Sequence, residues 1–116
     1  MPLNHVSLSV SDRERSAAFY GEHFGLTERI HEDEQRLILG SDDGSELALC
    51  HGGAIAEALP HTNHFGFRLA DGAAVRAARE LFRVASVKEA EWQDDGRFVR
   101  VQAFDPDGYR VEFYAH

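Results

Sequence analysis

The stretch that decides the fold is residues 62–71, which read TNHFGFRLAD. Apolar and polar side chains alternate along it, which is typical of a β-strand with one buried and one exposed face. The same pattern occurs near the amino terminus, where residues 4–12 read NHVSLSVSD. Each copy has Asn-His at or near its start and closes with Asp, and the two histidines lie about half a chain length apart. The sequence therefore predicts an internal duplication of one structural unit.

Composition limits the kinds of protein that the chain can be. With 116 residues, 43% of them hydrophobic and 28% charged, it is typical of one globular domain. No run approaches the roughly 20 apolar residues of a membrane span, and the amino terminus lacks signal-peptide features, so we expect a cytoplasmic protein without a membrane partner. The net charge of −8 repels phosphates and argues against a nucleic-acid partner.

Turn and helix signals extend the repeat to two similar halves. In the first half the predicted elements are the strand of residues 4–12, a helix from Ser11 to Gly25, and strands at 26–31, 36–40 and 46–50. In the second half they are a strand at 64–69, a helix at 72–84, and strands at 87–93, 98–104 and 109–114. We expect an α+β fold of two tandem βαβββ modules, residues 1–51 and 62–116, joined by a linker at 52–61.

The strands can be given a core face and an open face, because side chains alternate along a strand. The apolar positions form the core face, against the helices. The open face collects the remaining positions: His5, Ser7, Ser9, Glu46, Ala48, His64, Arg68, Arg100, Gln102, Glu112 and Tyr114. Three side chains of the types that bind metal ions, His5, His64 and Glu112, therefore share one face.

Three motifs carry a resemblance to a known family. They are Asn4-His5-Val6, Asn63-His64-Phe65 and the run DPDGYRVEF at residues 105–113. In this order around a βαβββ repeat they resemble the vicinal oxygen chelate superfamily of glyoxalase I, fosfomycin-resistance enzymes, extradiol dioxygenases and bleomycin-resistance proteins. The resemblance spans nearly the whole chain. It implies the glyoxalase/bleomycin-resistance/dioxygenase fold, a curved mixed sheet with helices on its outer face, and one divalent metal ion bound by His5, His64 and Glu112.

The ligand types agree with the chemistry of such a site. Two imidazoles and one carboxylate suit Fe²⁺, Mn²⁺, Ni²⁺, Co²⁺ or Zn²⁺ and leave positions open for a bidentate oxygen substrate. Whether the protein supplies a fourth metal ligand stays open. Glyoxalase I-type relatives resemble this chain in having a glutamate in the fourth strand, which would be Glu46, whereas matching the Asp-Gly turns of the halves pairs Ala48 with Glu112. Taken singly, each predicted ligand is more often a half-exposed or solvated surface residue than a metal ligand, whereas the coincidence of all three on one face favours the metal site.

Other residues near the open face are candidates for substrate binding: Ser7, Arg68, Phe98, Arg100, Gln102 and Tyr114. Guanidinium groups bind carboxylate or phosphonate through two parallel hydrogen bonds, so Arg68 and Arg100 favour a small anionic substrate. The alternative is that these arginines form surface ion pairs. Phe98 and Tyr114 form either pocket walls or dimer contacts, and no residue is assigned a catalytic role.

Two functions of different classes fit the sequence. The first is a metal-dependent enzyme, a dioxygenase, isomerase, lyase or thiol transferase, that chelates vicinal oxygens of a small substrate. The second is a metal-free protein that sequesters a drug or metabolite, as bleomycin-resistance proteins do; such binders usually lack the ligand triad, which favours the enzyme. Fosfomycin-modifying enzymes and extradiol dioxygenases carry a tyrosine where this chain has Gln102, so the reaction stays open. The resemblance also implies a homodimer, because many single-chain relatives dimerise.

Overall fold

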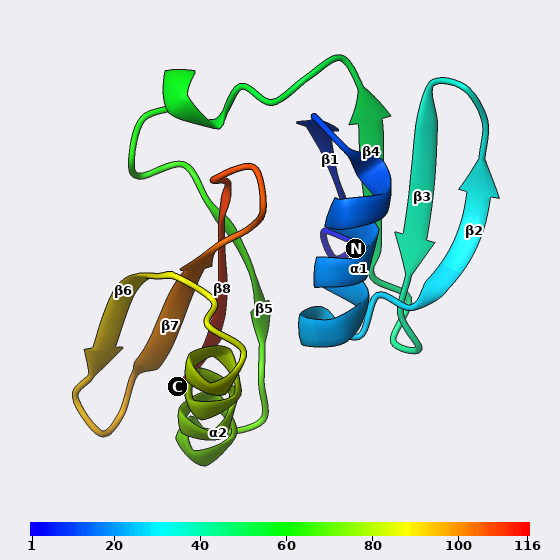
Figure 1. Cartoon of the computed structure of the whole chain (residues 1–116). Helices are drawn as coiled ribbons and strands as arrows, with labels where there is room; N and C mark the ends of the chain where they lie inside the picture. Colours follow the sequence, from blue (N-terminus) through cyan, green and yellow to red (C-terminus); the bar gives the residue numbers. More distant parts are fainter. The chain divides into compact units, whose positions relative to one another are not determined.

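The computed structural model describes all residues from Met1 to His116, in two compact units, Met1–Ala56 and Glu57–His116 (Figure 1). The elements of the first unit are β1 (His5–Val10), α1 (Arg13–Phe24), β2 (Glu28–Glu32), β3 (Arg36–Gly40) and β4 (Glu46–His51). The elements of the second unit are β5 (Phe65–Arg68), α2 (Gly72–Val84), β6 (Glu89–Asp94), β7 (Val99–Phe104) and β8 (Arg110–Ala115). A short 3₁₀ helix, Ala56–Ala58, lies at the boundary. No helix of the chain has the length and apolar character needed to cross a membrane.

Each unit forms its own four-stranded mixed sheet, and the two sheets share one topology. The strand order is β1-β4-β3-β2 in the first unit and β5-β8-β7-β6 in the second. In each unit the first and last strands pair in parallel, and the other pairs are antiparallel. The predicted α+β class and the βαβββ repeat are therefore confirmed, with one hydrogen-bonded sheet in each unit.

Helix α1 begins and ends at residues suited to helix caps. The carboxylate of Asp12 accepts hydrogen bonds from the backbone N–H groups of Glu14 and Arg15, two donors that have no partner within the first turn. The sequence pattern predicts that the helix begins at Ser11, whereas the N-cap is Asp12, one residue later. The reason is that the carboxylate of Asp12 reaches both donors. At the other end Gly25 has φ 70°, the left-handed conformation that favours glycine.

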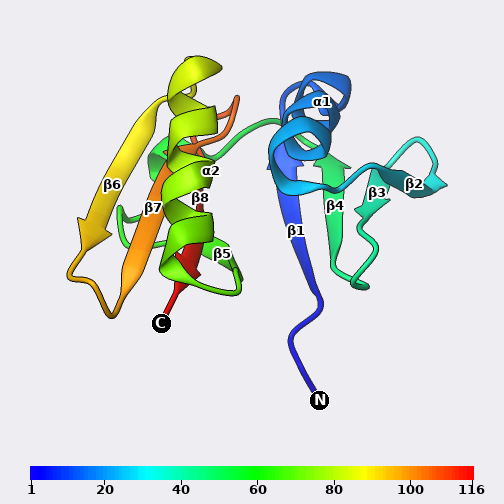
Figure 2. The same ribbon diagram turned by 90° about the horizontal axis from the view of Figure 1, so that it is seen from below.

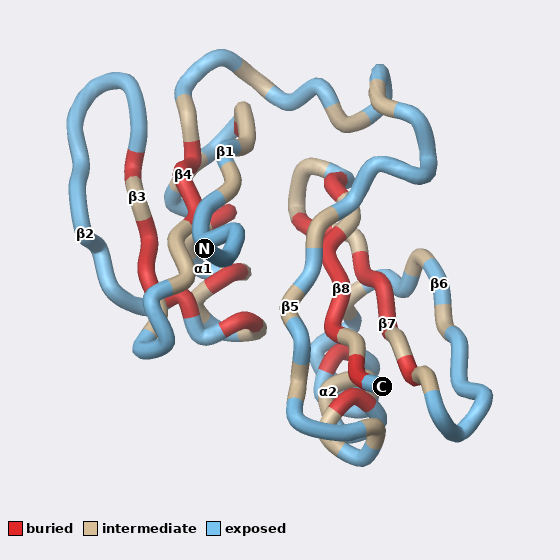
Figure 3. The backbone as a smooth tube through the Cα atoms, turned by 180° about the vertical axis from the view of Figure 1, so that it is seen from behind, coloured by how far each residue is buried: buried red, intermediate tan, exposed pale blue.

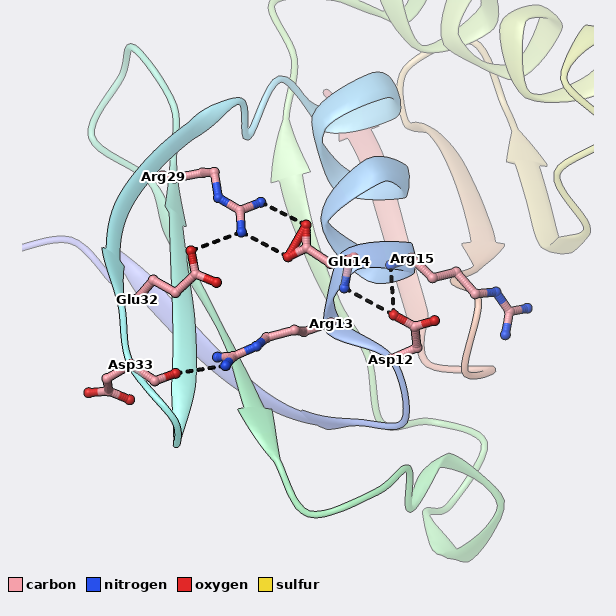
Figure 4. A network of polar contacts seen from close by, with 7 residues as sticks. All are labelled: Asp12, Arg13, Glu14, Arg15, Arg29, Glu32 and Asp33. Carbon is pink, nitrogen blue, oxygen red and sulfur yellow. Dashed lines mark hydrogen bonds and ion pairs between the residues drawn. The ribbon is translucent and has the colours of Figure 1, made fainter.

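Charged side chains connect α1 to the edge strand β2 (Figure 4). Arg29 on β2 donates to both carboxylate oxygens of Glu14 on α1, at 3.2 and 2.8 Å, and to Glu32 at 3.1 Å. The hydrogen bonds from Arg29 lower the pKa of the Glu14 carboxyl. Arg13 donates to the backbone oxygen of Asp33 at 2.7 Å. Because Glu14, Arg29 and Glu32 lie at the surface, their ion pairs orient β2 more than they stabilise the fold.

The core of each unit lies between one face of its sheet and its helix. Figure 3 shows the buried residues concentrated on the central strands, β3 and β4 in one unit and β7 and β8 in the other. Val99, Val101 and Ala103 alternate along β7 and are completely buried, as a period of two requires. Helix α2 lies across β7 and β8 (Figure 2), where Phe82 stacks on Phe113 with ring centroids 6.0 Å apart. This packing leaves the opposite face of the second sheet to its polar residues.

The observed bounds of the elements stay close to the predicted ones, and β3 and α2 coincide with the predicted ranges. The edge strands differ most. A register shift lies between Arg29 and His31 in β2 and between Glu89 and Glu91 in β6. Such a bulge changes the face that the following side chains take. Simple alternation in the sequence therefore does not predict the orientation of these residues.

Candidate functional site

The open face of the second sheet centres on Glu112, in the middle of β8. Its neighbours across the sheet are Gln102 on β7 and Gly66 on β5. Glu112 is 7% exposed and Gln102 is 1% exposed. Burial of a carboxylate and an amide is unfavourable unless both are well paired. Their burial on the face that the helix does not cover therefore indicates a site built for a polar task.

His64 faces this carboxylate from the residue before β5. Its Nδ1 lies 2.8 Å from the backbone oxygen of Thr62, and because a carbonyl oxygen only accepts, Nδ1 carries a proton. Its Nε2 lies 3.3 Å from Oε1 of Glu112. In the neutral ring Nε2 is an acceptor, so two acceptors face each other. A proton shared by the two groups, or a metal ion between them, would satisfy both acceptors.

The geometry of His64 and Glu112 fits two ligands of one metal ion. Ligand atoms about 2.1 Å from one ion, at a tetrahedral angle, stand roughly 3.4 Å apart. The observed separation of Nε2 and Oε1 is 3.3 Å. The hydrogen bond from Nδ1 to the Thr62 carbonyl is the kind of contact that orients a metal-binding imidazole. The donor set of the second unit is thus compatible with a divalent cation.

Gly66 makes room for the carboxylate of Glu112. A Cβ atom on Gly66 would lie 2.4 Å from Cγ of Glu112 and 3.0 Å from its backbone oxygen. Both distances are shorter than the optimal contact of non-bonded atoms. The side chain of Glu112 therefore leans over the bare backbone of β5, toward His64. A larger residue at position 66 would push the carboxylate aside.

Gln102 and Arg100 hold the same carboxylate from β7. The amide nitrogen of Gln102 donates to Oε1 of Glu112 at 3.2 Å, and its amide oxygen accepts from Nη1 of Arg110 at 3.2 Å. Nη1 of Arg100 lies 3.7 Å from Oε1. The contacts converge on Oε1, and Oε2 makes no hydrogen bond or ion pair. Because both ends of its amide have partners inside the site, Gln102 orients Glu112.

A cavity of about 470 Å³ lies beside this cluster, within the second unit. Its walls are His61, Thr62 and His64 before β5, Ala90 and Glu91 on β6, Arg100 and Gln102 on β7, and Arg110 on β8. Glu91 fixes Arg100 in the wall, with its carboxylate 3.1 Å from Nη2. Ala90 is the single apolar residue of the lining, so the cavity suits a small polar ligand.

Several residues of the lining are absent from the predicted site, Thr62, Glu91 and Arg110 among them. Arg110 precedes Glu112 by two positions on β8, so strand alternation was a sufficient signal to find it. Glu91 follows the register shift of β6, which alternation does not reveal. Thr62 takes part through its backbone oxygen, for which the sequence carries no signal.

The predicted substrate-binding residues of the second unit fall into two groups. Arg100 and Gln102 line the cavity, whereas Arg68, Phe98 and Tyr114 do not. Phe98 and Tyr114 form a ring cluster with His116, with centroids 6.1 to 6.4 Å apart. Arg68 pairs in register with Tyr114 and is exposed. The structure thus gathers these rings at one end of the β7–β8 pair.

The predicted site residues of the first unit lie on β1 and β4. His5 is exposed, with Nδ1 3.1 Å from Oδ1 of Asn4, and it pairs in register with Glu46. Ser7 is exposed and pairs with Ala48. Neither unit by itself brings three His, Cys, Asp or Glu side chains into a metal-binding group. Two of the three predicted ligands are therefore together in the second unit, and the third belongs to the first unit.

The matching registers of the two sheets identify the counterpart of Glu112 in the first unit. Ser7, two positions after His5, pairs with Ala48 in the first sheet. Gly66, two positions after His64, pairs with Glu112 in the second sheet. Ala48 therefore occupies the position of Glu112. Glu46 lies two residues earlier on its strand, where the second unit has Arg110. This register favours a set of three protein ligands over one that includes Glu46.

Comparison with known proteins identifies the family. Residues 2–113 match the model of the Glyoxalase/Bleomycin resistance protein/Dioxygenase superfamily, and the chain belongs to this superfamily. A comparison with curated protein sequences gives no significant match.

Solved structures with this fold include proteins of several kinds. A lactoylglutathione lyase from Agrobacterium tumefaciens is 21% identical, with 98% of this chain and 92% of that chain covered and a TM-score of 0.78. The fosfomycin resistance protein FosX from Listeria monocytogenes is 20% identical, with 100% and 93% covered and a TM-score of 0.80, and it was also solved with Mn(II) and sulfate. A possible glyoxalase from Bacillus cereus is 21% identical, with 97% of each chain covered and a TM-score of 0.79. At these identities the likeness establishes a shared fold.

Proposed function

We propose that the chain is a metal-dependent enzyme that binds vicinal oxygens of a small anionic substrate to one divalent metal ion. His64 and Glu112 supply two ligands, and His5 supplies the third. The observation that carries the proposal is the 3.3 Å distance between Nε2 of His64 and Oε1 of the buried Glu112 carboxylate. The working unit that we propose is a homodimer.

The ligand set defines which ions fit and what they would supply. Two imidazoles and one carboxylate suit Fe²⁺, Mn²⁺, Ni²⁺, Co²⁺ or Zn²⁺. Such an ion, when bound, polarises the substrate oxygens as a Lewis acid, and iron can also activate oxygen. This chemistry serves a dioxygenase, isomerase, lyase or thiol transferase.

The residues around the ligands have separate tasks. The Thr62 carbonyl fixes the proton of His64 on Nδ1 and so presents Nε2 to the ion. Gln102 and Gly66 hold Glu112 in the orientation that faces His64. Because Ala48 occupies the counterpart of Glu112, the first unit adds a single ligand and coordination positions stay open for two substrate oxygens.

The polar cavity favours this enzyme over the alternative, a metal-free protein that sequesters an aromatic drug or metabolite. Pockets for drug-sized molecules are lined mainly by apolar and aromatic side chains, whereas Ala90 is the one apolar residue of this lining. Metal analysis of protein purified without chelator separates the two functions. The enzyme should carry stoichiometric divalent metal, and the binding protein should carry none.

Replacing Glu112 by Gln tests the metal site. The amide keeps the size of the side chain but removes the charge that the cation requires. We expect the affinity for Mn²⁺ or Zn²⁺ to fall at least tenfold, about 1.4 kcal/mol, with an unchanged circular dichroism spectrum. Isothermal titration calorimetry on chelator-treated protein measures the affinity.

The matched control is Glu91→Gln, which removes a carboxylate from the wall of the same cavity. Glu91 pairs with Arg100 and is not a proposed ligand. We expect this variant to keep the metal affinity of the wild-type protein. Undiminished affinity in Glu112→Gln, or equal losses in both variants, would contradict the assignment.

A further inference from the structure

One guanidinium group of the cavity has no acidic partner. Arg100 lies beside two carboxylates, with Nη2 3.1 Å from Glu91 and Nη1 3.7 Å from Glu112. Arg110 lines the same cavity, but its hydrogen bond goes to the neutral amide of Gln102, at 3.2 Å, and it makes no ion pair. The chain has 20 acidic and 12 basic residues. A cationic group without an acidic partner in a cavity wall of such a protein indicates that the ligand brings the negative charge.

Arg110 is held in place without an ion pair. Its guanidinium lies over the ring of Phe104, 5.1 Å from the centroid, and Phe104 is its register partner on β7. The ammonium of Lys88 approaches the same ring, also at 5.1 Å, and adds positive charge nearby. The contact with Phe104 and the hydrogen bond to Gln102 position the guanidinium and leave most of its five N–H donors available. A fixed planar fork of donors matches the geometry of a carboxylate.

The position of Arg110 connects it to the proposed metal ligands. Arg110 and Glu112 lie on one face of β8, two residues apart, which is roughly 7 Å along a strand. His64 and Arg110 line the same cavity. A small molecule with oxygens near His64 and Glu112 can therefore extend an acidic group to Arg110.

We propose that Arg110 binds a carboxylate of the substrate, which makes the substrate a small carboxylic acid with two further, vicinal oxygens. We expect a substrate with a single negative charge, because one guanidinium of the cavity, that of Arg110, lacks an acidic partner. The carboxylates of Glu91 and Glu112 nearby disfavour a substrate with two negative charges. The vicinal oxygens rest on the proposed function. The inference of a carboxylate is argued from Arg110 and its contacts, which do not depend on a metal ion.

Titration of glycolate and its neutral isostere glycolamide into chelator-treated protein, followed by NMR, tests the carboxylate site without metal. We expect glycolate to bind at least fivefold more tightly than glycolamide. In Arg110→Gln we expect glycolate to bind at least fivefold more weakly than in the wild-type protein, about 1 kcal/mol. The matched control is Arg68→Gln. Arg68 is an exposed arginine of the same sheet that makes no ion pair and does not line the cavity, so its removal should change the affinity less than twofold.

Two further variants keep the outcome decisive. Arg110→Lys keeps the charge but not the planar fork, so it should show a smaller loss, and it replaces Arg110→Gln if that variant does not fold. Glu112→Gln, without metal, should bind glycolate at least as tightly as the wild-type protein, because it removes a negative charge next to the cavity. The two proposals can fail separately. If Glu112→Gln kept its metal affinity, the metal site would be wrong, while the loss of glycolate binding in Arg110→Gln would still support the carboxylate site. Equal affinities for glycolate and glycolamide, or equal losses in Arg68→Gln and Arg110→Gln, would overturn the assignment of Arg110.

Discussion

A single methyl group at position 66 should disable the proposed metal site. In Gly66→Ala the new Cβ would lie 2.4 Å from Cγ of Glu112. The clash is relieved by turning Glu112 away from His64 or by separating β5 from β8. We expect metal affinity to fall by about 10- to 100-fold, the range for residues that support a metal ligand. Calorimetric titration with Mn²⁺ or Zn²⁺ measures this loss.

The matched control for this substitution is Gly21→Ala on α1. Its Cβ would meet the Leu26 carbonyl at 3.6 Å and Thr27 at 4.0 Å, which is ordinary van der Waals contact. Metal affinity should not change, and the unfolding temperature should rise slightly because alanine favours a helix by roughly 0.5–1 kcal/mol over glycine. If Gly66→Ala bound metal as tightly as Gly21→Ala, the role given to Gly66 would be wrong.

At the scale of single residues, regular strand alternation was sufficient to predict which side chains of β7 and β8 share one face. On β7 and β8 the alternation is regular, so Arg100, Gln102 and Glu112 could be placed on one face. The role of Gly66 could not be predicted, because a glycine in a strand indicates a bulge or a close approach without showing which atom approaches. Glu91 was missed because the register shift of β6 changes its orientation.

At the scale of elements, the turn between β2 and β3 should respond to acid. Asp33 has its pKa lowered to about 2, first by the hydrogen bond from His31 and then by the backbone N–H groups of Gln35 and Arg36. Its pKa in the unfolded chain is about 3.9. Because the folded pKa is the lower one, the stability that Asp33 contributes is complete above about pH 4 and is lost as the pH falls toward 2.

Urea unfolding of the wild-type protein and of Asp33→Asn, from pH 5 down to pH 2, measures this contribution. The amide of Asn keeps an acceptor for the turn but has no carboxylate to titrate. We expect the stabilities of the two proteins to converge as the pH falls. Added salt should reduce their difference, since the group is exposed. Parallel curves over the whole range would show that the His31–Asp33 contact does not stabilise the fold.

Patterns within single elements were sufficient to predict the order of helices and strands. The range of α2 follows from its cap, Asp71, whose carboxylate accepts from the backbone N–H of Ala74. Which strands pair, by contrast, is not contained in the periodicity of any one strand. The division of the strands into two hydrogen-bonded sheets was therefore visible only in the structure.

At the scale of the whole molecule, the proposed ligand set draws on both units, because His5 belongs to one and His64 and Glu112 to the other. In the homodimer that we propose, one site can combine units of two chains. Mixing His5→Ala with His64→Ala protein should then restore tight metal binding in part of the sites, because each heterodimer contains one site with all three ligands. Calorimetric titration of the mixture, compared with each variant alone, measures the restoration.

A mixture of His64→Ala with Glu112→Gln serves as the control. Both substitutions lie in the second unit, so no exchange of chains rebuilds a complete ligand set. Failure of the first mixture to exceed this control would mean that each site takes all its ligands from one chain. A monomeric mass at micromolar concentration in sedimentation velocity would contradict the homodimer.

The two units differ at one pair of equivalent positions, where the first has apolar residues and the second has buried polar residues. In the first unit Ile38 pairs with Ala48, at the positions where the second unit pairs Gln102 with Glu112. The apolar pair carries no desolvation penalty, whereas burial of the polar pair carries one that its hydrogen bonds must offset. The same backbone arrangement thus occurs twice, once with an apolar pair at these positions and once with the polar pair of the proposed site. A stabilising substitution at the Ile38–Ala48 pair can therefore offset the cost of the polar pair without changing the proposed ligand Glu112.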